Sequence, residues 1–355
     1  MTIYDGNMCS PSVVKRGSCY NFESLKLIAK KINSYCSKNN INCNIIIQND
    51  SNFHDLLSNI QNKMDEISPC KTEVCWLKSE ILNELTHKER SLLQSGFKPM
   101  APLSWEKNYN EWLSTLDIAN VLKQYENQYK DFMLFGPTPI DFHLKNSDGS
   151  CKVDDLCAIN LKNLIDSGIT KVGIVFNTYP RYKGGQHWIS MYIDLIDNNC
   201  LHGGEHHYKH KKHKATHNKY KAKHKAKQEK NKHKIKKIEK GILQSPNNIN
   251  KKQNNDFISS GLYYFDSQGI KPPSNIINLM ENICYQGNKC NIKFQNLYND
   301  IQHQKKNTEC GIYRIHFITS MLKGIKFKDY INNVNDDEEM EKFRKVFFIF
   351  QNEIQ

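Results

Sequence analysis

The sequence predicts an α+β fold, a mixed sheet packed against a helix that begins at Cys310, with a helical arm ahead of this core. Three observations lead to this fold class. Apolar residues recur at helical spacing through the first hundred residues, strand-length apolar runs follow residue 170, and an apolar run of helical period starts at Cys310. A chain of 355 residues with 38% apolar content can also bury one large core or two smaller ones.

Residues 1–100 are expected to form the arm as a separate helical domain. The helices predicted from one-sided apolar spacing cover 23–36, 53–67 and 73–93. Cys70 and Cys75 are close enough in sequence to supply two metal ligands, but no second pair of Cys or His in this region matches them. We therefore predict no metal site in the arm, and no cofactor for the chain.

The twelve cysteines are scattered along a chain whose N-terminus, with Asp5, lacks the basic-then-apolar layout of a signal peptide. No apolar run reaches the length of a membrane span. Both observations favour a cytosolic address and free thiols over a disulfide framework.

Almost all of the basic character lies in one tract, Glu205 to Lys240. This tract holds fifteen Lys against three Glu, which is +12 of the chain's net charge of +13, and seven of the fourteen His. Because it repels itself and contains few apolar residues, 197–256 is predicted to be a disordered insertion at a loop tip of the core. Nonspecific binding to nucleic acid or to an acidic surface is the partnership that such a tract suggests.

Residues 101–355 are expected to form the core, interrupted by this insertion. The strands predicted from continuous apolar runs cover 171–179, 187–195, 261–266 and 291–298. The predicted helices cover 118–129, 155–166 and 272–284, and Asp117 is the expected cap of the first. Gly136, Pro137 and Pro139 are expected to break the pattern between the first two helices.

Cys310 stands directly before Gly311 at the start of the last long apolar run. In the first turn of a helix, unpaired amide groups and the positive end of the helix dipole favour a thiolate over a thiol, which suits a nucleophile. Gln304, six residues upstream, carries an amide that could donate to an oxyanion formed at the attacked carbon. The alternative is a small buried hydrophobe without chemistry, a common role for Cys.

Two further segments carry candidate partners for Cys310. Residues 184–195 read GGQHWISMYIDL, 263–269 read YYFDSQG and 303–313 read HQKKNTECGIY, so the order is His, acid, Gln, Cys. The motifs H-W, [Y/F]-D-S and Q-x5-C-G-I-Y in this order resemble the Ulp1-like cysteine proteases. That family includes SUMO-specific proteases, the adenovirus protease and the polyprotein proteases of large DNA viruses. The three segments also resemble those of the African swine fever virus polyprotein protease, which has Asn where this sequence has Asp266.

The resemblance implies a thiol peptidase with a Cys-His-Asp triad on a papain-related core. In that arrangement His187 is the general base and acid for Cys310, and Asp266 orients its imidazole. Gln304 and the Cys310 amide would form the oxyanion hole. Trp188 would roof a narrow channel for the substrate backbone, which favours Gly before the cleaved bond.

Some assignments stay open on sequence alone. Asp194 competes with Asp266 for the role of the acid, and Asp266 could instead be an ordinary turn residue. His303 and His316 lie within seven residues of Cys310 and could in principle act as the base. We expect the local helix and loop geometry to direct both of them elsewhere.

The function expected from these features is endopeptidase cleavage after Gly-Gly-type sites in viral polyproteins, in the virion and the host cytoplasm. One alternative is an isopeptidase that acts on SUMO or ubiquitin-like conjugates with the same chemistry. A different class is a nucleic-acid-binding virion protein, which explains the basic tract but not the order of His, acid, Gln and Cys. A catalytically dead binding module would be expected to lack a triad member, and none is missing.

Overall fold

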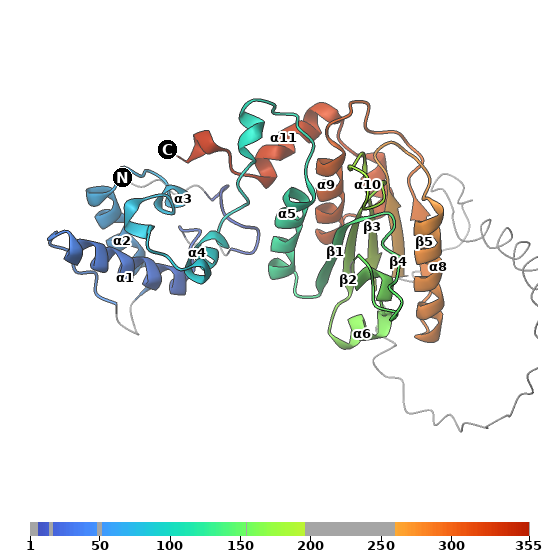
Figure 1. Cartoon of the computed structure of the whole chain (residues 1–355), viewed down its shortest axis with the longest axis horizontal. Coiled ribbons are helices and arrows are strands. Elements are labelled where there is room, and N and C mark those ends of the chain that lie inside the picture. Colours follow the sequence, from blue (N-terminus) through green and yellow to red (C-terminus); the bar gives the residue numbers. More distant parts are fainter. Residues whose placement is uncertain (1–5, 14–16, 48–51, 154, 196–259, 355) are drawn as a thin grey trace, which may run out of the picture. The chain divides into compact units, whose positions relative to one another are not determined.

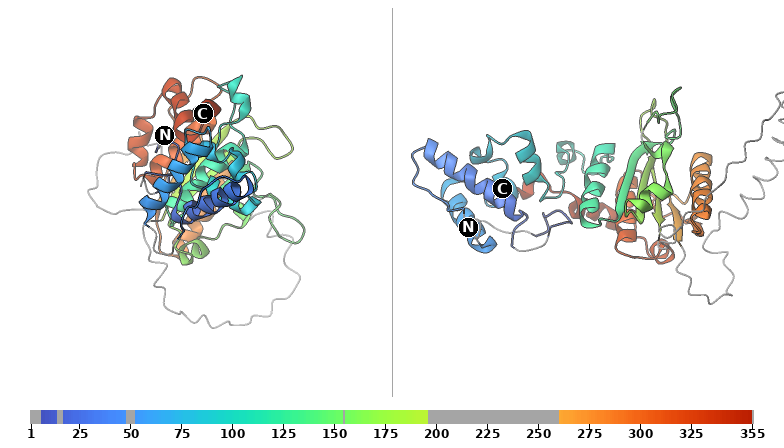
Figure 2. Two further views of the ribbon diagram at one scale, coloured as in Figure 1. Left: turned by 90° about the vertical axis from the view of Figure 1, so that its left-hand side faces the viewer. Right: turned by 90° about the horizontal axis from the view of Figure 1, so that it is seen from below.

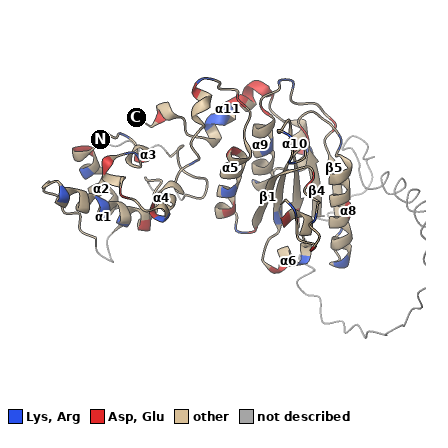
Figure 3. Ribbon diagram, in the orientation of Figure 1, with Lys and Arg blue, Asp and Glu red and all other residues tan. Residues whose placement is uncertain are grey.

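The computed structural model describes residues 6–13, 17–47, 52–153, 155–195 and 260–354. The predicted insertion at 197–256 lies outside the described residues. The chain forms two compact units, Met1–Tyr129 with Asp337–Gln355, and Lys130–Asp336 (Figure 1). On the helices of both units, Lys and Arg are interspersed with Asp and Glu (Figure 3), which agrees with a folded part of small net charge.

The first unit is helical, as the apolar spacing predicts. Its elements are α1 (Phe22–Lys38), α2 (Phe53–Ile67), α3 (Glu73–Trp76), η1 (Glu80–Leu82), α4 (His87–Gln94), η2 (Leu103–Glu106), α5 (Thr115–Gln128), α11 (Asp337–Phe347) and η6 (Gln351–Glu353). The side chains of Asn21 and Asn52 accept backbone N–H groups at the starts of α1 and α2, which explains where these helices begin.

The single helix predicted over 73–93 is wrong, because this segment contains three short elements. The apolar residues of 73–93 do keep helical spacing, but polar side chains that cap helix N-termini divide the segment. The side chain of Thr72 caps α3, and Thr86 forms a capping box with Glu89 that starts α4. Local hydrogen bonds to Thr side chains therefore override the apolar period here.

The boundary between the units also differs from the predicted one at 100/101. The C-terminal residues return to the first unit, where the Ala101 N–H donates to Ile349 O at 2.8 Å and the Ile349 N–H donates to Pro99 O at 2.9 Å. The ring of Phe348 packs edge-on against Trp105. Such a pairing across some 250 residues leaves no local pattern in the sequence.

Most of the described cysteines form disulfides, so the expectation of free thiols is wrong. Four pairs have both residues described, Cys9–Cys19, Cys36–Cys43, Cys70–Cys75 and Cys151–Cys157, and Cys290 is disulfide-bonded as well. Among the described residues, Cys284 and Cys310 are free thiols. In the four pairs the residues are ten or fewer positions apart, and the local turns hold their Cα atoms within bridging distance. The pairing also replaces the considered metal-ligand role of Cys70 and Cys75.

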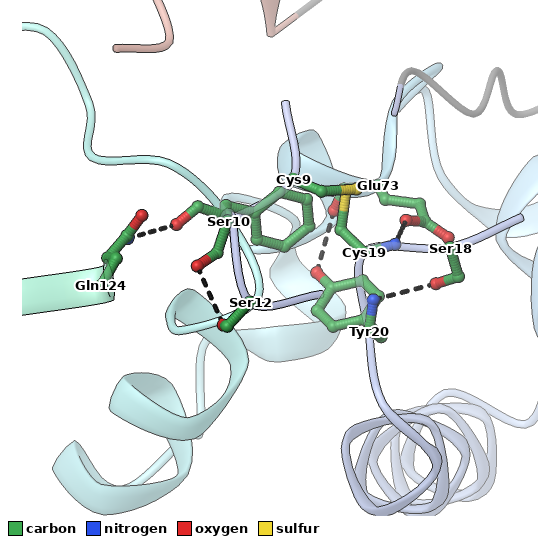
Figure 4. The surroundings of a disulfide bond; sticks show 9 residues. Cys9, Ser10, Ser12, Ser18, Cys19, Tyr20, Glu73 and Gln124 are labelled. Carbon is green, nitrogen blue, oxygen red and sulfur yellow. Dashed lines mark hydrogen bonds between the residues drawn. A yellow bond between two sulfur atoms is a disulfide. The ribbon is translucent and has the colours of Figure 1, made fainter. Parts of the chain in front are cut away.

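Beside the Cys9–Cys19 disulfide lies the buried carboxylate of Glu73 (Figure 4). Its Oε2 accepts the Cys19 N–H at 2.8 Å, while its backbone carbonyl accepts the Tyr20 hydroxyl at 2.9 Å. Oε1 has no hydrogen-bond partner among the described residues. Burial raises the pKa of Glu73 to about 6, although the hydrogen bonds from Cys19 and Ser18 oppose the rise.

This raised pKa predicts that the first unit becomes less stable as the pH rises. Below the ordinary pKa of Glu, both the folded and unfolded states are protonated, whereas above about pH 6 the folded state must hold a buried charge. The difference corresponds to about 2 kcal/mol of lost stability at pH 7. Glu73→Gln should remove this loss. Denaturant unfolding of the full chain at pH 4.5 and 7 measures it, and an equal pH dependence in both proteins would contradict the prediction.

The second unit is built on one five-stranded sheet. Its strands are β1 (Phe132–Pro139), β2 (Lys171–Asn177), β3 (Trp188–Asp194), β4 (Ser260–Phe265) and β5 (Phe294–Tyr298), in that order across the sheet. The outer pairs, β1 with β2 and β4 with β5, are parallel, and the inner pairs are antiparallel. The mixed sheet of the predicted α+β fold is therefore confirmed.

Helices cover both faces of this sheet (Figures 1 and 2). They are η3 (Asp155–Ala158), α6 (Leu161–Asp166), α8 (Ser274–Lys289), α9 (Cys310–Leu322) and α10 (Phe327–Asn332). On one face, α6 and α8 share a core with Ile174 of β2 and Met191 of β3. On the other face, Ile318 of α9 lies against Gly173 of β2. Because successive strand residues point to opposite faces, the continuous apolar runs of β2 and β3 serve both helical layers.

Among the described strands, β1 is the one that the sequence does not predict. Gly136, Pro137 and Pro139 indicate a break, yet the segment pairs with β2, with an irregularity between Phe135 and Thr138. Because β1 lies at the edge of the sheet, a residue without an N–H can face the open side without losing a ladder hydrogen bond.

Candidate active site

Three segments far apart in the sequence meet at one end of the strands. His187 directly precedes β3, Asp266 directly follows β4, and Cys310 is the first residue of α9. Since β3 and β4 are antiparallel neighbours with Ser190 opposite Phe265, the start of β3 lies beside the end of β4. The helix α9 packs across β3, so its first turn can reach the same place.

His187 has a hydrogen-bond partner on each side of its ring. Its Nε2 lies 2.7 Å from Asp266 Oδ1, and because a carboxylate only accepts, the imidazole N–H is the donor. The Cys310 side chain is also hydrogen-bonded to the ring, which leaves Nδ1 as the nitrogen that serves the sulfur. Burial lowers the pKa of His187, but the hydrogen bonds with Asp266 and Cys310 and the charge of Asp266 outweigh it, so the pKa lies above its ordinary value.

The carboxylate of Asp266 is almost fully buried, at 2% exposed. Asn299 holds its backbone, since Asn299 Oδ1 accepts the Asp266 N–H at 2.8 Å and Asn299 Nδ2 donates to Asp266 O at 2.7 Å. The Gln268 N–H donates to Asp266 Oδ1 at 2.9 Å. Backbone and side chain are therefore both held in the orientation that faces His187.

The competing acid Asp194 is at the other end of β3. It pairs with Lys171 of β2 and with Gly261 of β4, seven residues along the strand from His187. The structure does not bring Asp194 to the imidazole.

The side chain of Gln304 is buried beside Ser267, the residue after Asp266. The Ser267 hydroxyl donates to Gln304 Oε1 at 2.6 Å, and the Gln304 N–H donates to Ser267 O at 2.8 Å. Gln304 Nε2 donates to Lys306 O at 2.7 Å. With Oε1 occupied as an acceptor, the amide presents its NH₂ group as the donor end, and one of its two protons remains for another acceptor.

Comparison with known proteins relates this chain to viral proteases. No family model matches the chain. Over 357 residues, 96% of this chain and 93% of the relative, it is 25% identical to a thiol protease of Acanthamoeba polyphaga mimivirus. Over 86 residues, 24% of this chain and 32% of the relative, it is 36% identical to the SUMO-1 cysteine protease of African swine fever virus. The chain is a homologue of these viral thiol proteases.

The fold of the protease agrees with this relationship. The crystal structure of the African swine fever virus protease matches it with a TM-score of 0.53 at 17% identity, over 97% of this chain and 96% of that chain. The predicted α+β fold is therefore confirmed. The homology to viral thiol proteases shows that the protein is a cysteine-type peptidase.

Trp188 of the protease is the first residue of β3, next to His187, and pairs with Asn177 of β2. Its side chain is buried, at 7% exposed. Trp188 is therefore adjacent in sequence to the candidate base. Its contact with a substrate backbone remains a prediction.

The two alternative bases have other partners. His316 Nδ1 lies 3.0 Å from the Tyr330 hydroxyl, and His303 packs against the ring of Phe265. Burial lowers the pKa of each to about 4, so both imidazoles are neutral at neutral pH. Among the histidines near Cys310, His187 is the one bonded to a carboxylate.

Three residues of this site are absent from the sequence-based assignment. Asn299 and Ser267 orient the acid and the amide, and Arg314 lies one helical turn after Cys310. Only Arg314 leaves a local signal, because it is the single Asp, Glu, Lys or Arg residue of a mostly apolar helix. The roles of Asn299 and Ser267 depend on contacts between loops that the sequence separates.

The described residues contain no group of three or more His, Cys, Asp or Glu side chains that could hold a metal ion. No helix in that part of the chain is long and apolar enough to cross a membrane.

Proposed function

We propose that the protease hydrolyses peptide bonds with Cys310 as nucleophile, His187 as general base and acid, and Asp266 as the residue that orients the imidazole. The observation that carries this proposal is one imidazole hydrogen-bonded to both a buried carboxylate and a thiol. A raised His pKa favours an imidazolium, which in turn favours the thiolate as its partner.

The proposed reaction has two halves. The Cys310 thiolate attacks the carbonyl carbon, and as the C–N bond breaks, His187 gives its proton to the leaving amine, which produces a thioester. His187 then takes a proton from water, the resulting hydroxide attacks the thioester, and the C–S bond breaks to release the acid and the thiolate. The negative oxygen in each half would be stabilised by Gln304 Nε2 and the Cys310 N–H.

Gln304→Ala should lower kcat by about 10²- to 10³-fold with little change in KM, because the oxyanion develops only in the transition state. Ser267→Ala, which leaves the amide present but releases its Oε1, should cause a smaller loss. Asn307→Ala is the matched control, since Asn307 carries an amide on the same loop and is exposed. Equal turnover in Gln304→Ala and Asn307→Ala would place the oxyanion donor elsewhere.

For the substrate we propose a polypeptide with Gly residues before the cleaved bond, in viral polyproteins that mature in the virion and host cytoplasm. The motif resemblance and the viral relatives support this class. A peptide series ending in Gly-Gly, Ala-Gly, Gly-Ala or Ala-Ala before the cleaved bond tests it. Preference for Gly-Gly in kcat/KM is expected, and equal cleavage of Ala-Ala would reject the Gly requirement.

A second candidate is removal of a ubiquitin-like protein from its conjugates. The observation in its favour is the name of the African swine fever virus relative, a SUMO-1 cysteine protease. A SUMO conjugate and a Gly-Gly peptide should be compared at equal concentration. A kcat/KM that is orders of magnitude higher for the conjugate would favour recognition of a folded partner over a polyprotein segment.

The basic tract Glu205 to Lys240 is proposed to be an accessory that binds nucleic acid or acidic surfaces. Replacing it with a short Gly/Ser linker should leave small-peptide cleavage within a few-fold of the wild type, since the triad residues lie outside it. The same deletion should weaken retention on DNA, and retention of the intact chain should fall steeply with salt. Loss of peptide cleavage in a deletion that still melts cooperatively would contradict this assignment.

A further inference from the structure

Arg314 is a fully buried cation in the helix that carries the nucleophile. It lies four residues after Cys310 on α9, which places it on the same helix face one turn away. Its side chain is 0% exposed, although burial of a charged group is costly unless the charge is compensated. A buried cation one helical turn from the candidate nucleophile therefore indicates an electrostatic role in addition to packing.

The hydrogen bonds of Arg314 are incomplete. Its Nη1 donates to Phe265 O at 2.6 Å, and its guanidinium lies over the Phe265 ring at 4.6 Å from the ring centre. Nε and Nη2 have no hydrogen-bond partner among the described residues. The one partner that it does bond is the residue directly before Asp266.

Titratable groups from several elements face Arg314. Asp266 and a Cys310 thiolate attract it, as do the hydroxyl groups of Tyr264 on β4 and Tyr330 on α10 when ionised. A protonated His187 and a protonated His303 repel it. Burial lowers the pKa of Arg314 and the attraction by Asp266 opposes this, but a guanidinium remains protonated at any pH that the fold tolerates.

We propose that Arg314 is the electrostatic positioning residue of the triad, a permanent buried cation that stabilises the Cys310 thiolate and anchors the Asp266 turn through Phe265 O. This inference rests on the proposed function of Cys310 and His187. Asp266 alone would stabilise the imidazolium and disfavour a nearby thiolate. Arg314 offsets that negative charge, so that the thiolate and the imidazolium can exist together.

The proposal predicts a specific change in pH dependence. A nearby cation lowers the pH at which the thiol loses its proton, and also the pH at which the imidazolium does. Removing the cation should therefore move the acid and the basic limbs of the kcat/KM profile in the same direction, toward higher pH, by about one pH unit. A merely structural role would lower activity without moving the limbs.

Arg314→Met tests this, because its apolar side chain has a similar length and no charge. Removing one partner of a buried charge pair costs stability, so circular dichroism and thermal melting of the variant accompany the kinetics. Arg314→Lys keeps the charge and should keep both limbs near their wild-type positions while lowering kcat/KM. Arg344→Met is the matched control. Arg344 is equally buried and lies over the Trp105 ring at 4.5 Å in the other unit, so its replacement should not move the limbs.

A second measurement separates this inference from the proposed function. The rate of Cys310 alkylation by iodoacetamide, followed by peptide mapping across pH, reports the thiolate without any substrate. Cys284 serves as an internal reference, since burial raises the pKa of that thiol. The Cys310 profile should move to higher pH in Arg314→Met and not in Arg344→Met.

The outcomes are distinct. If wild-type Cys310 alkylates no more readily than Cys284 near neutral pH, the proposed function itself fails. If wild-type Cys310 is reactive and Arg314→Met leaves both the alkylation profile and the kcat/KM limbs unmoved, Arg314 is only structural and the inference is overturned. Should Arg314→Met fail to fold, Arg314→Gln, which retains a donor for Phe265 O but no charge, carries the same expectation.

Discussion

Replacement of Cys310 by Ser should lower peptide cleavage by on the order of 10⁶-fold, the loss seen when a nucleophile that acts as a unit with its base is removed. A hydroxyl is far less acidic than a thiol, so His187 cannot hold the oxygen as an anion, and the attack on the carbonyl carbon fails. The side chain is 2% exposed and Ser is slightly smaller than Cys, so the helix should stay folded.

The measurement is kcat/KM on a Gly-Gly peptide together with covalent labelling by an electrophilic probe built on the same peptide. Cys284→Ser is the matched control, because Cys284 is the other free thiol among the described residues and lies on α8, hydrogen-bonded to Asn296. This control should retain activity within about two-fold. Retention of more than a small fraction of activity in a folded Cys310→Ser protein would remove Cys310 from the mechanism.

His187→Ala should cause a loss of similar size, because the thiolate then lacks the group that protonates the leaving amine. Asp266→Asn should be milder, since an amide oxygen can still accept the Nε2–H of the imidazole at the 2.7 Å position. His143→Ala controls for loss of a histidine in the same unit, as its side chain is exposed. Turnover on the peptide and circular dichroism of each variant are the measurements.

The pH profile of the wild type adds a further check on His187. Its raised pKa means that the imidazolium persists to higher pH than for an ordinary histidine, so the basic limb should lie above the usual His range. In Asp266→Asn the group that raises the pKa of His187 loses its charge, so this limb of the profile should move to lower pH.

The alternative bases are tested by the same assay. A larger loss of turnover in His303→Gln or His316→Gln than in His187→Ala would instead assign the base to one of those residues.

Some elements of both units follow directly from the apolar pattern of the sequence, and others do not. Apolar periodicity was sufficient for α1, α2 and α9, and continuous apolar runs for β2, β3 and β4, because these elements are long and bury a regular face. The apolar pattern did not predict the structure over 73–93, where side-chain caps divide the helix. It also did not predict β1, where an edge position in the sheet tolerates proline. It also did not indicate the disulfides, which depend on how short loops bring paired Cα atoms together.

Local motifs and composition are enough to predict the α+β class, the charge of the basic tract and the candidate residues His187, Asp266, Gln304 and Cys310. They do not predict which acid faces the imidazole, that Ser267 and Asn299 orient the amide and the acid, or that Arg314 is buried beside them. Strand pairing and helix packing join segments up to 123 residues apart, and hydrogen bonds and charges between such segments depend on distance in space rather than along the chain.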